Sequence, residues 1–129
     1  MLNVDSVEAV LRTDQGQVRD HNEDFVAYYE PVGRADEVKN GWLYLVADGV
    51  GGAEAGEVAS QVACEQTLAH YLADGQTSDP AERLVTAIRR ANDELRRMVS
   101  EREIPVHMAT TLVGAAILGN RAYLANVGD

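Results

Sequence analysis

The sequence predicts an α+β fold, because strand-like and helix-like patterns occupy separate stretches of the chain. Short apolar runs occur in the first fifty residues, and two long segments with helical spacing of apolar side chains follow. Two more apolar runs, separated by the turn dipeptide Gly119-Asn120, complete the pattern. With 129 residues, of which 46% are hydrophobic and 25% charged, we expect one domain at most.

The first strands are expected at residues 6–13 and 25–29. A third, at residues 41–48 with the sequence GWLYLVAD, is apolar on both alternating faces, which is typical of a strand buried on both sides. We therefore expect it to be central in the sheet. Residues 30–41 contain Pro31, Gly33, Asn40 and Gly41, and predict a turn-rich hairpin connection.

Two helices are expected next. The first covers residues 54–73 and ends before Gly75, which suits a helix stop. The second begins after Asp79, a capping residue, with Pro80 in its first turn. Its apolar stripe consists of Leu84, Ile88, Ala91, Leu95 and Met98.

The other side of the second helix is rich in arginine. Its members are Arg83, Arg89, Arg90, Arg96, Arg97 and Arg102. Acidic residues interspersed among them favour a solvated face, and a partner-binding surface is the alternative. The last two strands, at residues 110–118 and 121–127, are apolar on both faces, so we expect them inside a sheet that is covered on both sides.

The net charge of −10 argues against a nucleic-acid module, which would carry a basic face. The acid is concentrated early, with 12 acidic and 4 basic residues up to Glu57 and 9 and 7 after it. This excess reflects either solubility or carboxylates gathered to hold divalent cations. No apolar run approaches the roughly 20 residues of a membrane span. The lone Cys64 favours a small buried residue in a reducing compartment, so we expect a cytoplasmic protein.

Three groups of residues carry possible chemistry. The segment RDHNED, residues 19–24, combines a guanidinium, an imidazole, an amide and three carboxylates between two expected strands. The segment VADGVGG places Asp48 and Gly49 between a strand and a helix. Asp129 follows the last strand and could add one more oxygen ligand.

The glycine-rich stretch has two interpretations. Strand, glycine loop and helix in that order suggest a dinucleotide-binding turn, yet Glu54 stands where the third glycine should be, and Asp48 would repel a pyrophosphate. Carboxylates at neighbouring strand ends, together with a glycine carbonyl, are better suited to a hard cation such as Mg²⁺ or Mn²⁺. Taken alone, the segment at residues 19–24 favours an acidic turn over a functional site.

The motifs TDQGQVRDHNED, VADGVGGAEAGEVAS, MATTLV and NVGD, in this order, resemble the N-terminal part of the metal-dependent protein phosphatases, the type-2C or PPM family, particularly its bacterial Ser/Thr members. The resemblance implies an antiparallel β-sandwich flanked by helices, with four layers in the order αββα. Because the family domain is about twice as long, residues 1–129 would form its N-terminal half, and the sandwich would be incomplete.

The resemblance also implies roles for individual residues. Arg19 would bind the substrate phosphate, and Glu23 would ligate a metal, largely through water, beside Asp24. Asp48 would bridge two Mn²⁺ or Mg²⁺ ions, and the carbonyl of Gly49 would bind one of them. A last aspartate, Asp129, would match the ligand of a third, weaker metal.

In such a site Asp24 and Asp48 are the catalytic pair, because the ions they hold would activate a water that attacks phosphorus directly. The substrates would be proteins phosphorylated by a Ser/Thr kinase. The family often carries histidine where this chain has Val50 and Ala53, so no general acid is assigned there. His21 remains either an acid–base group or a partly exposed turn residue.

Three functions follow as hypotheses. The first is a protein Ser/Thr phosphatase, of which this chain is the N-terminal half. The second is a non-catalytic half-domain, or pseudophosphatase, that binds phosphoproteins or a partner kinase. The third is a nucleotide-binding domain. Because the later aspartates of the family have no counterpart here, we expect the chain alone to be inactive, and either to self-associate or to need a complementary C-terminal half.

Overall fold

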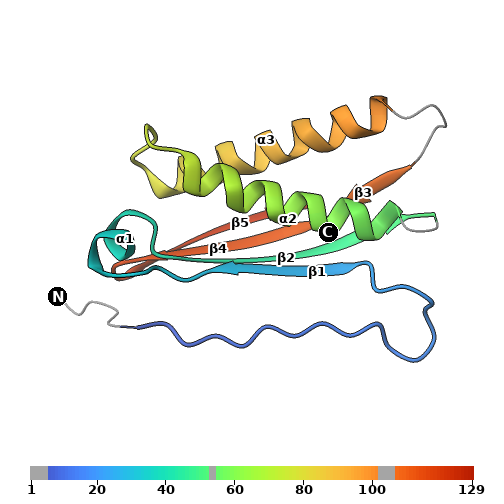
Figure 1. Cartoon of the computed structure of the whole chain (residues 1–129), viewed down its shortest axis with the longest axis horizontal. Helices are drawn as coiled ribbons and strands as arrows, with labels where there is room; N and C mark the ends of the chain where they lie inside the picture. Colours follow the sequence, from blue (N-terminus) through green and yellow to red (C-terminus); the bar gives the residue numbers. More distant parts are fainter. Residues whose placement is uncertain (1–5, 53–54, 102–106) are drawn as a thin grey trace.

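The computed structural model describes residues 6–52, 55–101 and 107–129. It contains one five-stranded antiparallel sheet with two long helices packed against one of its faces (Figure 1). The elements in chain order are β1 (Asp24–Tyr29), α1 (Arg34–Lys39), β2 (Trp42–Gly51), α2 (Ala55–Ala73), α3 (Pro80–Ser100), β3 (Met108–Thr110), β4 (Leu112–Leu118) and β5 (Arg121–Val127). The α+β class predicted from the sequence is therefore confirmed.

Strand β2 is central, as predicted. The sheet has the order β1-β2-β4-β5, and β3 pairs with the end of β2. Along β2, Leu43 to Asp48 pair with β1, and Trp42 to Val46 pair with β4 on the other side. The strand does not end at Asp48, because Gly49 to Gly51 pair with β3. The sequence prediction of a loop directly after Asp48 was thus wrong, since β3 supplies a partner that extends the strand.

Helix α2 approaches the sheet closely because small residues recur on one side of it. Ala55, Ala59, Ala63 and Cys64 are buried along this side, and Tyr71 is buried near the end. Burial raises the pKa of the Cys64 thiol to about 12, so this residue is an inert core group, as expected. The predicted start at residue 54 lies outside the described residues.

Helix α3 follows the predicted pattern. The carboxylate of Asp79 accepts a hydrogen bond from the Ala81 amide at 3.0 Å, and Pro80 is the first helical residue. Leu84, Ala91 and Leu95 of the predicted stripe are buried. Its arginines divide into two groups, because most are exposed whereas Arg83 is buried, with only 4% of its surface accessible. The expectation that Arg83 belongs to a solvated face was wrong, and Arg102 lies outside the described residues.

The core lies between the sheet and the helices. In β2, Leu43, Leu45 and Ala47 are fully buried toward α2, whereas Val46, which points the other way, is half exposed. On β5, Leu124 is 77% exposed. The described residues therefore form two layers, a sheet and helices, of the four that the family resemblance implied. This agrees with the expectation that the four-layer sandwich is incomplete in residues 1–129. Self-association through the unpaired edges of the sheet remains a prediction.

Three further predictions from the sequence differ from the structure. Residues 6–13 were expected to form a strand, but they have no strand pairing and run in extended form on the side of the sheet away from α2 and α3 (Figure 1). The connection at residues 30–41 contains the short helix α1 rather than turns alone. The strand expected at residues 110–118 is β4, which begins at Leu112, and the short strand β3 before it was not predicted.

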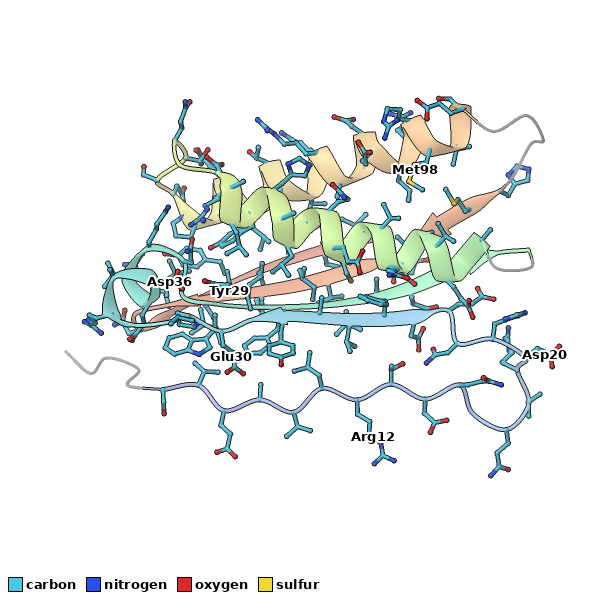
Figure 2. The ribbon with its side chains drawn as sticks, in the orientation of Figure 1. Arg12, Asp20, Tyr29, Glu30, Asp36 and Met98 are labelled. Carbon is cyan, nitrogen blue, oxygen red and sulfur yellow. The ribbon has the colours of Figure 1, made fainter. Side chains whose placement is uncertain are left out.

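A polar cluster joins the elements at the end of the sheet where β1 finishes. The Asp36 carboxylate accepts hydrogen bonds from the Tyr29 hydroxyl, the Val32 amide at 2.8 Å and the Asn40 side chain. Figure 2 labels Tyr29 and Asp36 at this end. The Tyr29 hydrogen bond, supported by the others, lowers the pKa of Asp36.

Arg83 belongs to the same end of the molecule. Its guanidinium donates to the carbonyl of Tyr71 at 2.7 Å, to the carbonyl of Lys39 at 2.9 Å and to the side chain of Asn40. It also lies over the ring of Tyr71, 4.1 Å from the ring centre. One buried side chain therefore ties α3 to the ends of α2 and α1.

None of the helices among the described residues is long and apolar enough to cross a membrane.

Candidate metal centre

Asp24 and Asp48 lie directly opposite each other at the end of the sheet remote from the Asp36 and Arg83 cluster. They are the last pair in the antiparallel register of β1 with β2. Side chains of directly opposed residues have Cβ atoms about 4.5–5.5 Å apart. The pKa of Asp24 is raised, first by desolvation and then by the charge and side chain of Asp48, with Glu23 adding a smaller effect. Among the ion pairs of the described residues, none joins Asp24 or Asp48 to a basic side chain.

Two threonines hold the backbone of Asp48. The Thr111 amide donates to the Asp48 carbonyl at 2.9 Å, and the Asp48 amide donates to the Thr111 hydroxyl at 3.2 Å. The Thr110 hydroxyl donates to the same carbonyl at 3.1 Å. These contacts fix the point at which the Asp48 side chain leaves the sheet. Both threonines belong to the motif MATTLV, for which the sequence predicted no role.

A hydrogen-bonded turn carries Arg19 toward the same place. The Asp14 carboxylate accepts from the Gly16 amide at 2.7 Å, and Gly16 has the positive φ of 78° that suits glycine. The side chain of Gln15 donates to the Arg19 carbonyl at 2.8 Å. Asn22 closes the turn, because its amide nitrogen donates to the Thr13 hydroxyl at 2.9 Å and its oxygen accepts from the Asp24 amide at 3.1 Å.

The turn and the sheet end enclose a hollow of about 210 Å³. Five of the residues predicted from the sequence line it, namely Arg19, Glu23, Asp24, Asp48 and Gly49. Asp129, the sixth, does not line this hollow, although it lies at the same end of the sheet, since the neighbouring Gly128 approaches Thr111. The structure therefore brings together the predicted phosphate-binding arginine and the predicted metal-binding carboxylates, except Asp129.

Glu23 occupies a different position from the aspartate pair. Its carbonyl accepts a hydrogen bond from the Gly49 amide at 2.9 Å. Its carboxylate lies against Gly56 in the first turn of α2, so close that a Cβ on Gly56 would overlap Oε2 and lie 2.8 Å from Cδ. Within the described residues, no group of three or more histidine, cysteine, aspartate or glutamate side chains is arranged to hold one ion.

The donors nevertheless fit a divalent cation in part. Asp24 and Asp48 supply hard oxygen ligands, and the raised pKa of Asp24 reflects a cost that a cation placed between them would remove. Gly49 lines the same hollow. The ligand chemistry favours Mg²⁺ or Mn²⁺ over softer metals, because no thiol and only one imidazole, His21, line the hollow among the described residues.

His21 faces the first turn of α2. Its Nδ1 lies 3.3 Å from Oε1 of Glu57, and both side chains are partly exposed. His21 was predicted as either an acid–base group or a turn residue, and Gly56 and Glu57 were not predicted as neighbours of the site. Sequence spacing gave no signal for these contacts, because they join segments more than thirty residues apart.

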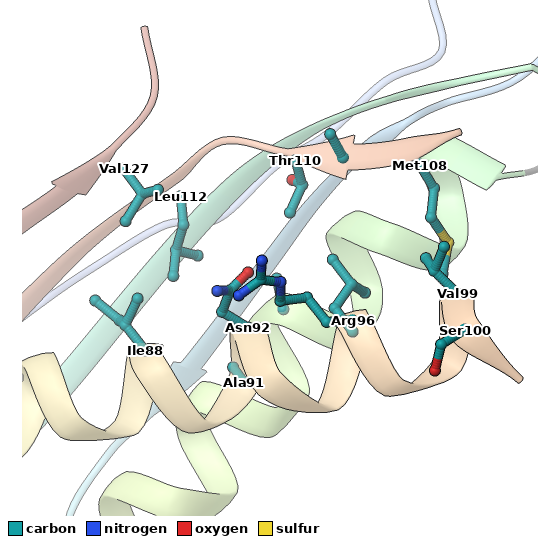
Figure 3. Close-up of a pocket in the computed structure, with 13 residues that line it drawn as sticks. Ile88, Ala91, Asn92, Arg96, Val99, Ser100, Met108, Thr110, Leu112 and Val127 are labelled. Carbon is teal, nitrogen blue, oxygen red and sulfur yellow. The ribbon is translucent and has the colours of Figure 1, made fainter. Parts of the chain in front are cut away.

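A second, more apolar hollow of about 440 Å³ lies between α3 and strands β3, β4 and β5 (Figure 3). Ile88 and Leu112 line it, and Asn92 and Arg96 extend from α3 beside it. It contains no carboxylate among the described residues. The chemistry of the site therefore resides at the Asp24 and Asp48 end of the sheet.

The fold and these residues agree with what a comparison with known protein families finds. The chain belongs to the protein phosphatase 2C family, whose model matches residues 17–129. The recognition from sequence motifs is thereby confirmed.

Individual relatives are bacterial serine/threonine phosphatases. The chain is 34% identical to the serine/threonine phosphatase stp of Listeria welshimeri over 127 residues, which cover 95% of this chain and 48% of that protein. It is 36% identical to the serine/threonine protein phosphatase PstP of Mycobacterium tuberculosis over 118 residues, which cover 92% of this chain and 21% of PstP. The chain spans about half the length of the first of these relatives.

Solved structures share the fold. The crystal structure of M. tuberculosis PstP matches with a TM-score of 0.72 and 36% identity, over 92% of this chain and 45% of that one. The catalytic domain of PstP, solved in complex with two manganese ions, matches with a TM-score of 0.71. Stp1 from Staphylococcus aureus matches with a TM-score of 0.72 and 28% identity, over 98% of this chain and 51% of Stp1.

Proposed function

We propose that this chain is the N-terminal half of a metal-dependent protein Ser/Thr phosphatase domain that acts on phosphoserine and phosphothreonine in proteins. The single observation that carries the proposal is the pairing of Asp24 with Asp48 in one hollow with Arg19. The names of the bacterial relatives support the substrate class. The proposed substrates are phosphoproteins produced by a Ser/Thr kinase.

Each residue of the proposed site has a role that follows from the chemistry of its side chain or carbonyl. The guanidinium of Arg19 offers a planar set of donors that matches phosphate oxygens. Asp24 and Asp48 would hold two divalent cations, with the Gly49 carbonyl as a further ligand and Glu23 acting through water. Cations bound there would supply positive charge for the phosphate and a water of lowered pKa. The manganese ions of the PstP catalytic domain support Mn²⁺ as the first ion to test.

Asp129 would bind a third, weaker ion. The position of Gly128 beside Thr111, which in turn contacts Asp48, supports this part of the proposal. The chain would then contribute Asp129 from the open end of β5 rather than from the hollow itself.

The test is the substitution Asp48→Asn. We expect it to lower Mn²⁺-dependent phosphate release from a phosphothreonine peptide by more than about 100-fold, because losing a shared ligand charge weakens both ions and leaves the water less acidic. Activity is measured on this chain and, where the encoded protein continues past Asp129, on the full-length protein. Asp93→Asn, on the exposed side of α3, is the matched control and should have no effect. Near-normal turnover of Asp48→Asn at saturating Mn²⁺ contradicts the assignment.

A second candidate function is a non-catalytic, phosphoprotein-binding half-domain. It is favoured by one observation, that no group of three potential metal ligands is arranged around one point in the described part of the chain. This candidate predicts that the full-length protein binds phosphothreonine peptide with no phosphate release at any Mn²⁺ concentration. Turnover that depends on Asp48 excludes it.

A further inference from the structure

The first turn of helix α2 touches the functional segment, residues 19–24, at two separate points. The first point is Gly56, which has no side chain and leaves room for the Glu23 carboxylate. Gly49 faces the same turn, since a Cβ there would overlap the Gly56 carbonyl and lie 2.9 Å from the Glu23 carbonyl. The backbones of Glu23, Gly49 and Gly56 therefore meet at one point, and two of these three residues have no side chain.

The second point is Glu57, which follows Gly56 directly. Its Oε1 lies 3.3 Å from Nδ1 of His21, two residues before Glu23. The main chain of Glu23 is in turn held by the Gly49 amide at 2.9 Å. Glu23 is thus held on both sides, through its own carbonyl by β2 and through His21 by α2.

We propose that the first turn of α2 positions the functional segment for metal and phosphate binding. Gly56 leaves the space that the Glu23 carboxylate occupies, and Glu57 holds His21 in place. The inference rests on the proposed function, because it assigns a role toward the same site. Gly56 and Glu57 are positioning residues, since neither is expected to touch the substrate.

The physical argument is one of geometry and charge. The N-terminal end of a helix carries partial positive charge, so a carboxylate beside α2 is held in a favourable field. A Cβ on Gly56 would collide with the end of the flexible Glu23 side chain, which can rotate away at little cost to folding. It would also lie 3.1 Å from the carbonyl carbon of Gly49, so the backbone there must shift by a few tenths of an ångström. Substitution of Gly56 should therefore move Glu23 while leaving most of the core unchanged. Residues that orient metal ligands typically change metal affinity by about 10–100-fold.

Two variants test the proposal, Gly56→Ala and Glu57→Ala. We expect each to weaken Mn²⁺ binding by about 10-fold, measured by titration with detection of free Mn²⁺ by electron paramagnetic resonance. We also expect hydrogen exchange of the Gly49 amide, measured without metal, to become faster by about 10-fold, because Glu23 is its acceptor. The second readout depends on neither metal nor activity.

The controls are matched in chemistry. Gly75→Ala replaces a glycine with open space around it, and Glu65→Ala removes an acidic residue farther along α2. Both should keep wild-type Mn²⁺ affinity and Gly49 exchange. Far-UV circular dichroism shows whether each variant folds. If either Gly56→Ala or Glu57→Ala fails to fold, the remaining variant tests the proposal.

The outcomes separate the two claims. If the wild-type chain binds no Mn²⁺, the metal part of the proposed function fails, and the positioning role toward a metal fails with it. If the wild-type chain binds Mn²⁺, and both variants match their controls in affinity and exchange, the positioning role is wrong while the proposed function stands. Faster exchange with unchanged Mn²⁺ affinity also overturns the proposal, because the contact is then structural only.

Discussion

The two ends of strand β1 each carry an aspartate in a polar cluster, but the clusters are built in opposite ways. Where β1 ends, Asp36 accepts hydrogen bonds from three donors, and its pKa is lowered. Where β1 begins, Asp24 faces Asp48, and its pKa is raised. The Asp36 carboxylate is satisfied by donors of the protein itself, whereas the proposed function gives Asp24 a bound cation as its partner.

The arginines of the two ends differ in the same way. Arg83 is buried and uses its donors on two carbonyls and one amide oxygen. Arg19 is exposed in the hollow, and its guanidinium has no hydrogen-bond partner among the described residues. A polar cluster whose bonds are complete stabilises a fold, and one whose charges remain uncompensated is a candidate for binding. The predictions below test this distinction between the two ends.

The largest effect on stability is expected at the satisfied end. Arg83→Ala leaves the buried acceptors of Tyr71 and Asn40 and the part-buried carbonyl of Lys39 without this donor, and should lower the free energy of unfolding by about 3 kcal/mol. Urea unfolding measures the change. Arg89→Ala, an exposed arginine of the same helix, should change it by less than about 0.5 kcal/mol. Equal effects of the two substitutions would contradict the structural role of Arg83.

The next effect concerns binding at the other end. Arg19→Ala removes charge-assisted hydrogen bonds to phosphate, and should weaken binding of a phosphothreonine peptide in the presence of Mn²⁺ by about 10–100-fold. Because Arg19 is not an expected metal ligand, Mn²⁺ affinity should change little. Calorimetry measures both constants. A loss that lies mainly in Mn²⁺ binding would show that Arg19 acts on the metal site instead.

The smallest effect is the repulsion between Asp24 and Asp48 in the absence of metal. Asp24→Asn should raise the free energy of unfolding at pH 7 by about 0.2–1 kcal/mol, since like charges directly opposite destabilise a sheet. The raised pKa of Asp24 means that the folded chain holds this proton more tightly than the unfolded chain. The wild type therefore loses stability as pH rises from the ordinary pKa, 3.8, through the raised one. The advantage of Asp24→Asn should vanish below pH 3.8, and an advantage independent of pH would contradict the repulsion.

The sequence predicted well whatever depends on local pattern. The cap at Asp79, the stripe of α3, the central β2 and the turn at Gly119 all follow from residue type and spacing. Residues 6–13 show the limit of such patterns, because an extended, alternating sequence becomes a strand only where a partner is available. Strand β3 was missed because it is only three residues long, which is too short for a pattern, and because it pairs with the glycine stretch of β2.

The sequence predicted the residues of the candidate site, but it did not predict the contacts that hold them in place. Arg19, Glu23, Asp24, Asp48 and Gly49 were identified from motifs and line one hollow. Arg83 was misplaced because a helical pattern separates apolar from polar positions, and it cannot show that a polar side chain will find buried acceptors. The contacts of Gly56 with Glu23 and of Glu57 with His21 join distant segments, so only the folded chain reveals them.

The central claim is that the Asp24 and Asp48 end binds divalent cations whereas the Asp36 end does not. Thermal unfolding of the chain with and without millimolar Mn²⁺ tests it most directly, because a ligand that binds only the folded state raises the midpoint. We predict a rise of about 5 °C for the wild type and for Asp36→Asn, and no rise for Asp48→Asn. An equal rise in all three proteins, or a rise lost only in Asp36→Asn, would contradict the account.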